Sequence, residues 1–166
     1  MERVEISGHC TDKMIEKVCM VKSLKELKIL GCRFVTGVFL GELASNELVM
    51  LDVSHSEHIE MAEVLNCVRQ NTKTLSKLKI DGESATTKQC QEMVDTMQTL
   101  RVVSIRYCQE IESDFIFSLA AGIKRSNCVI EKIFMRKGGL FSTMALETLL
   151  SHKMPYLRHL NIDECE

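Results

Sequence analysis

The chain contains little proline and little tyrosine. Its 166 residues include one proline and two tyrosines. This composition leaves little room for a flexible proline-rich linker or for a platform of aromatic side chains on which nucleotides stack. We therefore expect a single domain that spans residues 1–166 and contains no linker.

The chain also lacks long apolar runs, a secretion signal and an excess of basic residues. No apolar run reaches the roughly 18 residues of a membrane-spanning helix, and no basic segment followed by an apolar one opens the chain. The formal net charge of −2 and the pI of about 6.2 argue against a dedicated nucleic-acid-binding protein. We expect a cytoplasmic protein, or alternatively a nuclear one, that binds neither nucleic acid nor membrane.

A short phrase of the type Leu-x-x-Leu-x-Ile recurs along the chain. It begins at positions 24, 48, 75, 100, 130 and 157, and a weaker version surrounds Val4 and Ile6. The separations between these starts are 24, 27, 25, 30 and 27 residues, which suits one strand and one helix per repeat. The spacing predicts a repeat architecture that presents a surface to a partner, because stacked units have no inherent active-site cleft.

The segments between the phrases have the apolar spacing of amphipathic helices. Six helices are expected, and their apolar positions are Ile15, Val18 and Cys19; Leu40, Leu43 and Ala44; Met61, Val64, Leu65 and Val68; Cys90, Met93, Val94 and Met97; Ile116, Leu119, Ala120 and Ile123; and Leu146, Leu149 and Leu150. Side chains that can cap helix starts are Thr11, Asp12, Thr36, Thr87, Ser113 and Ser142. Pro155 is expected to end the last helix before its strand.

Alternate residues of each predicted strand point away from the helices and form the candidate functional surface. Cationic side chains are frequent there in the third to fifth full repeats, and aromatic residues accompany them. The predicted partner-binding residues are Lys77, Lys79, Arg106, Tyr107, Lys132, Phe134 and Arg136. Such a surface favours an acidic segment of another protein, and the alternative is an ordinary solvated sheet face.

The recurring phrase resembles that of the leucine-rich repeat family, in its ribonuclease-inhibitor-like and cysteine-containing subclasses, over essentially the whole chain. Cys32, Cys108 and Cys165 stand at the ninth place of their repeats, where the family uses Asn or Cys, whereas His9, Ser56, Glu83 and Gly138 depart from the pattern. The resemblance implies an α/β solenoid with a parallel concave sheet of about seven strands and convex helices. It also implies a non-catalytic interaction module, similar to the substrate-binding arms of F-box ubiquitin ligases or the sensor regions of nucleotide-binding immune receptors.

Neither an F-box nor a nucleotide-binding motif is present in the sequence. The first and last repeats lack the polar capping units that solenoids use. We therefore expect a fragment of a longer protein, with self-association through uncapped ends as the alternative.

Catalytic and metal-binding motifs are weak. His55 and His58 have the spacing of two metal ligands, but they fall at a predicted turn with no further ligand near in sequence. His9, Cys10, Cys32 and His55 could converge on one rim to bind zinc or be oxidised, but buried thiols and polar turn groups are favoured. No Cys-x-x-Cys pair occurs among the eight cysteines, so we expect reduced thiols and no metal. No local phrase assembles an activated thiolate, a base and an oxyanion site, and no phosphate-binding loop is visible, so we also expect no cofactor and no enzymatic activity.

Overall fold

The computed structural model describes residues 1–43, 47–81, 85–96, 99–107, 111–125, 129–136, 141–151 and 154–163. The strands are β1 (Arg3–Ser7), β2 (Glu26–Leu30), β3 (Met50–Asp52), β4 (Lys77–Asp81), β5 (Val102–Arg106), β6 (Lys132–Arg136) and β7 (His159–Asp163). The helices are α1 (Asp12–Cys19), the 3-10 turn η1 (Leu40–Glu42), α2 (Met61–Gln70), α3 (Thr87–Thr96), α4 (Ser113–Arg125) and α5 (Thr143–Ser151). The protein is therefore α/β, as the sequence predicts.

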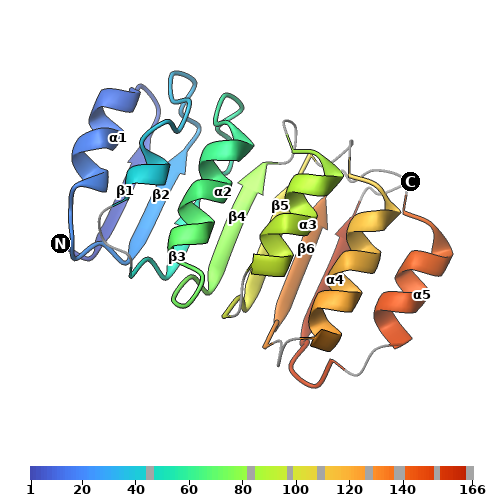
Figure 1. Ribbon diagram of the computed structural model, residues 1–166. Coiled ribbons are helices and arrows are strands. Elements are labelled where there is room, and N and C mark those ends of the chain that lie inside the picture. Colours follow the sequence, from blue (N-terminus) through green and yellow to red (C-terminus); the bar gives the residue numbers. More distant parts are fainter. Residues whose placement is uncertain are drawn as a thin grey trace.

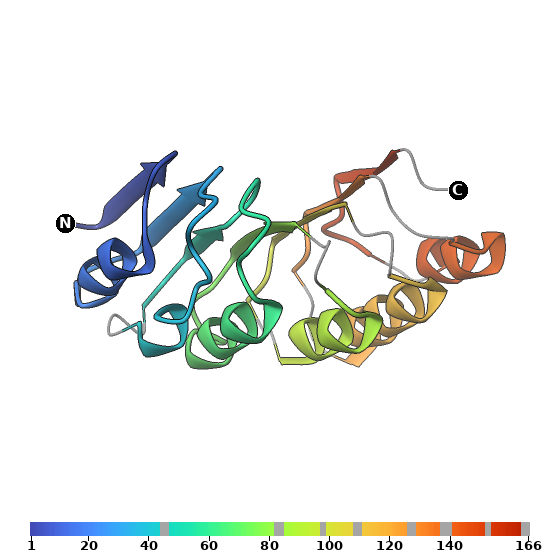
Figure 2. The same ribbon diagram turned by 90° about the horizontal axis from the view of Figure 1, so that it is seen from above.

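The strands form one parallel sheet of seven strands in chain order, from β1 to β7. The helices lie along one face of this sheet (Figure 1). Seen from above, sheet and helices follow a gentle arc with the helices on its outer side and the sheet on its inner side (Figure 2). We call the two sides the outer face and the inner face.

The recurring phrases align in register across the sheet. The fourth-place residues form one continuous row, which consists of Val4, Leu27, Leu51, Leu78, Val103, Ile133 and Leu160. Members of this row from Leu27 to Ile133 are buried, and together with the apolar sides of the helices they form a single core. A one-residue slip would move a whole row of apolar side chains to the inner face, so burial fixes the register.

Most of the predicted apolar helix positions are buried. In α2 the four residues Met61, Val64, Leu65 and Val68 are all at most 3% exposed. The prediction is wrong for Leu150 of α5, which is 60% exposed, because that helix turns Ala145 and Leu149 to the core. Val94, Met97 and Ile123 lie outside the residues whose side chains the structure describes.

The prediction of a helix around Leu40 and Leu43 is wrong. The chain forms only the three-residue turn η1 there, although both leucines are buried, and Ala44 lies outside the described residues. Gly37 and Gly41 lower the helix propensity of the segment. The length of the repeat is not the cause, because the preceding repeat, from Val4 to Leu27, is one residue shorter and forms the helix α1.

The predicted helix caps are partly correct. Ser142 Oγ accepts a hydrogen bond from Ala145 N at 3.2 Å at the start of α5, as expected. At α3 the cap is Thr86 and not Thr87, because Thr86 and Gln89 bond each other's backbone amides in a capping box. Thr87 Oγ1 instead accepts from Glu112 N at 3.0 Å, which links two neighbouring repeats.

The contacts described for three other predicted caps differ from this arrangement. Thr11 precedes α1 without a side-chain cap bond, and Thr36 hydrogen-bonds to Asp12 of the preceding repeat. Ser113 is already the first residue of α4, and its hydroxyl accepts from Ser142 N at 2.8 Å. The side chains of Thr36 and Ser113 thus connect neighbouring repeats.

The described helices include none that combines the length and the apolar character needed to cross a membrane. The longest of them, α4, has 13 residues.

Candidate functional site

The predicted site residues lie together on the inner face. Lys77, Val102 and Lys132 form one row across β4, β5 and β6. The next row contains Lys79, Ser104 and Phe134, and the third contains Asp81, Arg106 and Arg136. Tyr107 follows β5 directly. The strand order thus brings the six predicted strand residues to one face of β4, β5 and β6, with Tyr107 at the rim where β5 ends.

Three of the five predicted cations are compensated by carboxylates of the neighbouring strands. Lys79 Nζ lies 3.3 Å from Asp52 Oδ2, and Arg106 Nη2 lies 2.8 Å from Asp81 Oδ1. Arg136 Nε lies 3.6 Å from Asp163 Oδ2. These three side chains therefore offer less free charge to a partner than the sequence suggests.

Lys77 and Lys132 differ from these three cations in their charge compensation. Within the part of the chain that the structure describes, neither lysine has an ion-pair partner. Lys77 is exposed and Lys132 is half-buried. With a strand spacing of about 4.8 Å, their backbones are about 10 Å apart on either side of Val102.

Half-buried apolar side chains accompany these two lysines. Val102 and Phe134 are diagonal neighbours on β5 and β6, and both are half-buried on the uncovered face. Met50 is similarly half-buried beside Lys77. We call Lys77, Val102, Lys132 and Phe134 the inner patch. Its combination of apolar area and unpaired positive charge suits an acidic segment that carries an apolar side chain.

A polar network stands at the rim next to the inner patch. Asp81 joins two strand ends, because its carboxylate accepts from His55 N and from Arg106 Nη2. Arg106 Nη1 also lies 2.7 Å from His55 Nε2, and its guanidinium carbon lies 5.7 Å from the centre of the Tyr107 ring. The Asp81 side chain is only 6% exposed, so this network belongs to the structure of the rim.

The rim contains unusual backbone conformations. Outside glycine, His55 and Tyr107 are the residues with positive φ in the described part of the chain, at 62° and 55°. Left-handed conformations cost non-glycine residues about 1 kcal/mol or more. Their bonds to neighbouring strands hold them there, since His55 N donates to Asp81 and Tyr107 N donates to Arg136 O at 2.8 Å.

Sequence reasoning missed His55 as a member of this network and interpreted it only as a weak metal ligand. It also missed Val102 as part of the inner patch. The alignment of repeats carries a signal for Asp81 and Arg106, since both occupy the seventh place of neighbouring phrases. No comparable signal exists for His55, whose position depends on a left-handed turn.

The structure contradicts the prediction of reduced thiols at one pair of cysteines. Cys10 and Cys32 are joined by a disulfide, so the prediction of reduced thiols is wrong for this pair. The two residues follow β1 and β2 at equivalent turns, and stacking of the repeats brings their Cα atoms to 5.9 Å. Cys108 and Cys165 lie outside the described residues.

Cys19, Cys67 and Cys90 are buried thiols outside any disulfide, as the prediction of reduced thiols requires. Burial, with a smaller contribution from the charge of Glu42, raises the pKa of Cys19 to about 12. Burial also raises the pKa of Cys67 to about 12. Both groups are thiols at neutral pH and are poor nucleophiles.

Metal-binding side chains do not gather among the described residues, where no group of three or more His, Cys, Asp or Glu is placed to hold a metal ion. His9 packs against the Phe34 ring with centroids 6.3 Å apart. His55 bonds to Arg106, as described above. The convergence considered for His9, Cys10, Cys32 and His55 thus results in a disulfide, a ring contact and a hydrogen bond.

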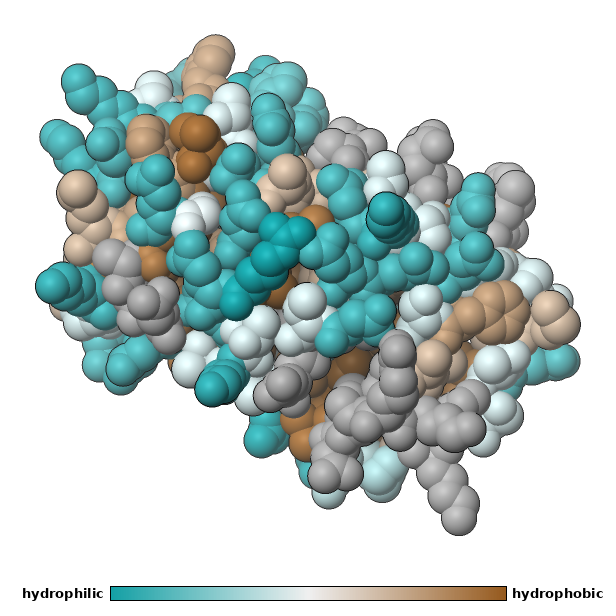
Figure 3. Space-filling model, viewed as in Figure 1, coloured by the Kyte–Doolittle hydropathy of each residue, from teal (hydrophilic) through white to brown (hydrophobic). Residues whose placement is uncertain are grey.

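The outer face is mostly hydrophilic, with separate small apolar areas over the helices (Figure 3). No protein-family model matches the chain, and no curated protein matches its sequence.

Proposed function

We propose that this chain is a leucine-rich repeat solenoid that binds an acidic segment of another protein on the inner face of its sheet and catalyses no reaction. The register of the recurring phrases supports the repeat assignment, since equivalent residues of all strands form continuous rows. The arc with helices outside and sheet inside fits it as well (Figure 2).

The inner patch is the observation that carries the binding proposal. Lys77 and Lys132 flank Val102 in one row, and neither has a carboxylate partner among the described residues. Their neighbours Lys79 and Arg106 are compensated by Asp52 and Asp81. An acidic partner would therefore gain two uncompensated contacts here, while Val102 and Phe134 supply apolar area.

The test compares two charge-matched double variants in affinity isolation from cell extract followed by a binding titration. Lys77→Glu with Lys132→Glu reverses both charges of the inner patch. Lys13→Glu with Lys88→Glu makes the same change in net charge on exposed positions of α1 and α3. We expect the first variant to bind the isolated partner at least roughly tenfold more weakly and the second to bind it unchanged.

Circular dichroism and thermal unfolding of both variants verify that the fold is retained. Equal binding by wild type and the Lys77→Glu, Lys132→Glu variant would contradict the proposal. Loss of binding only in the Lys13→Glu, Lys88→Glu variant would place the interaction on the outer face.

A further inference from the structure

One backbone hydrogen bond recurs at all six steps from strand to strand. The amide at the third place of a phrase donates to the carbonyl at the second place of the preceding phrase, at 2.9 to 3.1 Å. The donor and acceptor pairs are Glu26 and Glu2, Met50 and Lys25, Lys77 and Val49, Val102 and Ser76, Lys132 and Arg101, and His159 and Glu131. Arg3 N holds the donor place on the outer edge of β1, and Arg158 O holds the acceptor place on the outer edge of β7. The two edges of the sheet are therefore complementary for this bond.

The side chains at the second place give the two edges opposite charge. Glu2 Oε1 lies 2.9 Å from Lys25 Nζ, and Arg101 Nη1 lies 2.8 Å from Glu131 Oε1. Arg158 follows Glu131 in this row, since Arg158 N donates to Glu131 O at 2.8 Å. The Arg158 side chain is exposed and has no ion-pair partner in the described part of the chain. A Glu2 carboxylate placed beyond β7 would continue the alternation of charge in this row.

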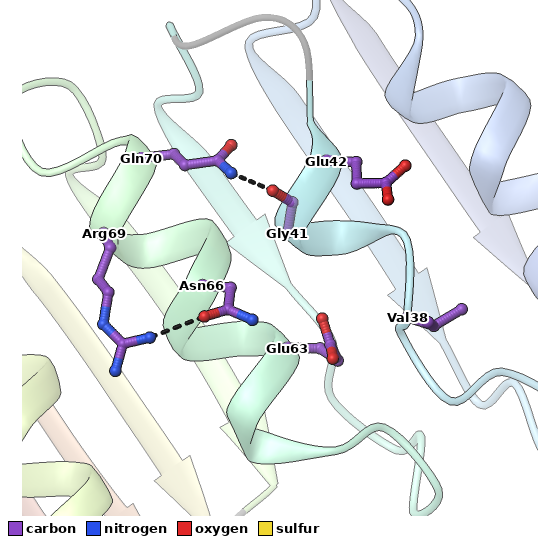
Figure 4. A pocket seen from close by; sticks show the side chains of 7 residues that line it. All are labelled: Val38, Gly41, Glu42, Glu63, Asn66, Arg69 and Gln70. Atoms are coloured by element: carbon purple, nitrogen blue, oxygen red, sulfur yellow. Dashed lines mark hydrogen bonds between the residues drawn. The ribbon is translucent and has the colours of Figure 1, made fainter.

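Each helix has one flank towards the preceding repeat and one towards the following repeat. On α2 these flanks are marked by Glu63, which lines the pocket towards η1, and by Arg69 on the opposite side (Figure 4). Arg69 Nε lies 2.9 Å from Glu92 Oε1 of the following helix α3. Glu63 directly precedes and Arg69 directly follows the buried pair Val64 and Val68, so the position next to such a pair identifies the flank.

The equivalent flank positions of the first and last helices are apolar and exposed. The equivalent buried pairs are Ile15 and Cys19 in α1 and Ala145 and Leu149 in α5. Met14 therefore faces away from the second repeat and is 49% exposed, and Leu150 faces away from α4 and is 60% exposed. In agreement, Asp12 lies on the other side of α1 from Met14, and its Oδ1 accepts from Thr36 N of the second repeat at 3.0 Å. Both outer flanks thus carry apolar area beside the strand edges.

We infer that the β7 edge of one copy of this chain binds the β1 edge of a second copy. The contact continues the parallel sheet, because Arg3 N of the second copy donates to Arg158 O and Glu2 pairs with the Arg158 side chain. Met14 and Leu150 cover each other, since they lie on facing flanks. A head-to-tail contact uses two different surfaces, so each added copy leaves a further edge open and assembly does not stop at a dimer. The inner patch on β4 to β6 stays uncovered, so this contact is independent of the proposed function.

The test is sedimentation-velocity ultracentrifugation of the wild type and of two variants that each block one edge. Leu150→Glu with Arg158→Glu blocks the β7 edge by charge. Ser7→Pro with Met14→Glu blocks the β1 edge, because Gly8 N bonds to β2 and the Ser7 amide therefore points outward, where proline removes it. We expect the wild type to form dimers and larger species as its concentration rises, whereas each variant alone stays monomeric. An equal mixture of the two variants should form a dimer that grows no further, because it retains one intact edge of each kind.

A matched variant and a measurement of the fold control this test. Val38→Glu with Lys88→Glu makes the same two kinds of change as Leu150→Glu with Arg158→Glu, at exposed positions away from both edges, and should assemble like wild type. Circular dichroism verifies that all variants retain the fold. A wild type that is monomeric at every accessible concentration, or that stops at a dimer, would overturn the inference. So would assembly that persists in either edge variant, or a mixture that contains only monomers.

Discussion

Arg106 and His55 lie 51 residues apart in sequence, and their side chains meet with Nη1 at 2.7 Å from Nε2. A guanidinium can only donate, so Nε2 of His55 must accept and the ring proton must reside on Nδ1. We predict that long-range ¹H–¹⁵N spectra at neutral pH show His55 in the Nδ1–H tautomer. Arg106→Lys should change this signal, while His58, which is exposed, should serve as an unaffected internal control. An Nε2–H tautomer in the wild-type protein would contradict the bond.

The Asp81–Arg106 pair should contribute much more to stability than the Arg136–Asp163 pair. Asp81 is 6% exposed and Arg106 is 23% exposed, whereas both members of the second pair are more than half exposed. Removing one partner of a largely buried pair leaves the other uncompensated. We expect Asp81→Ala to lower the free energy of unfolding by about 2 to 4 kcal/mol, and Asp163→Ala by less than about 1 kcal/mol.

Urea unfolding of the two single variants measures this difference, and a double-mutant cycle with Arg106→Ala isolates the pair. A coupling energy near zero between Asp81 and Arg106 would show that the rim network adds nothing to stability.

The left-handed backbone of His55 gives a matched comparison between two substitutions. Both His55→Ala and His55→Gly remove the ring that bonds to Arg106, but only glycine adopts φ of 62° without steric cost. We predict that His55→Gly is more stable than His55→Ala by about 1 kcal/mol in chemical unfolding. The reverse order would mean that the turn relaxes when the ring is lost.

How far the sequence predicted this structure depends on the kind of contact. The strand phrases encode both the strand and its register, because burying Leu27, Leu51 and Leu78 in one row leaves a single alignment. From that alignment the pairing of Asp81 with Arg106 follows as well. The turn η1 could not be read from the apolar spacing, since Leu40 and Leu43 are buried whether or not a helix forms.

Charge compensation between strands did not enter the sequence prediction of the candidate site. Lys77, Lys79 and Lys132 were treated as equivalent cations, although the alignment of the phrases places Asp52 opposite Lys79 in the same way as it places Asp81 opposite Arg106. Lys79 meets Asp52, whose side chain is 6% exposed. For the disulfide, the sequence predictions include the convergence of Cys10 and Cys32 as an alternative but favour reduced thiols. The two cysteines are 22 positions apart and form no Cys-x-x-Cys pair, and the stacking of the repeats brings them together.

The Cys10–Cys32 disulfide should stabilise the first two repeats. It closes a loop with a sequence separation of 22 residues, for which the loss of chain entropy in the unfolded state is about 3 kcal/mol. We predict that Cys10→Ser with Cys32→Ser lowers the free energy of unfolding by about that amount, and that dithiothreitol has the same effect on the wild type. Peptide mapping without reduction should recover a linked peptide pair, and alkylation of both cysteines under those conditions would contradict the bond.

The raised pKa of Cys67 predicts a loss of stability at alkaline pH. The ordinary pKa is 9.0 and burial raises the folded-state pKa to about 12. Below pH 9 the thiol is protonated in both states, so its full contribution to stability is present there. As the pH rises from 9 towards 12, the unfolded chain ionises first and folding is disfavoured. Cys67→Ala should flatten the pH dependence of the free energy of unfolding between pH 9 and 12. The same slope in the variant and the wild type would mean that folding does not raise the pKa of Cys67.

Site-specific photo-cross-linking tests the central claim, a partner on the inner face, most directly. Benzoylphenylalanine is placed at position 102 in the inner patch or at exposed position 88 on α3, in otherwise identical protein mixed with its isolated partner. We expect a cross-linked complex from position 102, absent when Lys77 and Lys132 are reversed to Glu, and none from position 88. A complex that forms from position 88 and not from position 102 would contradict the account and place the interaction on the helices.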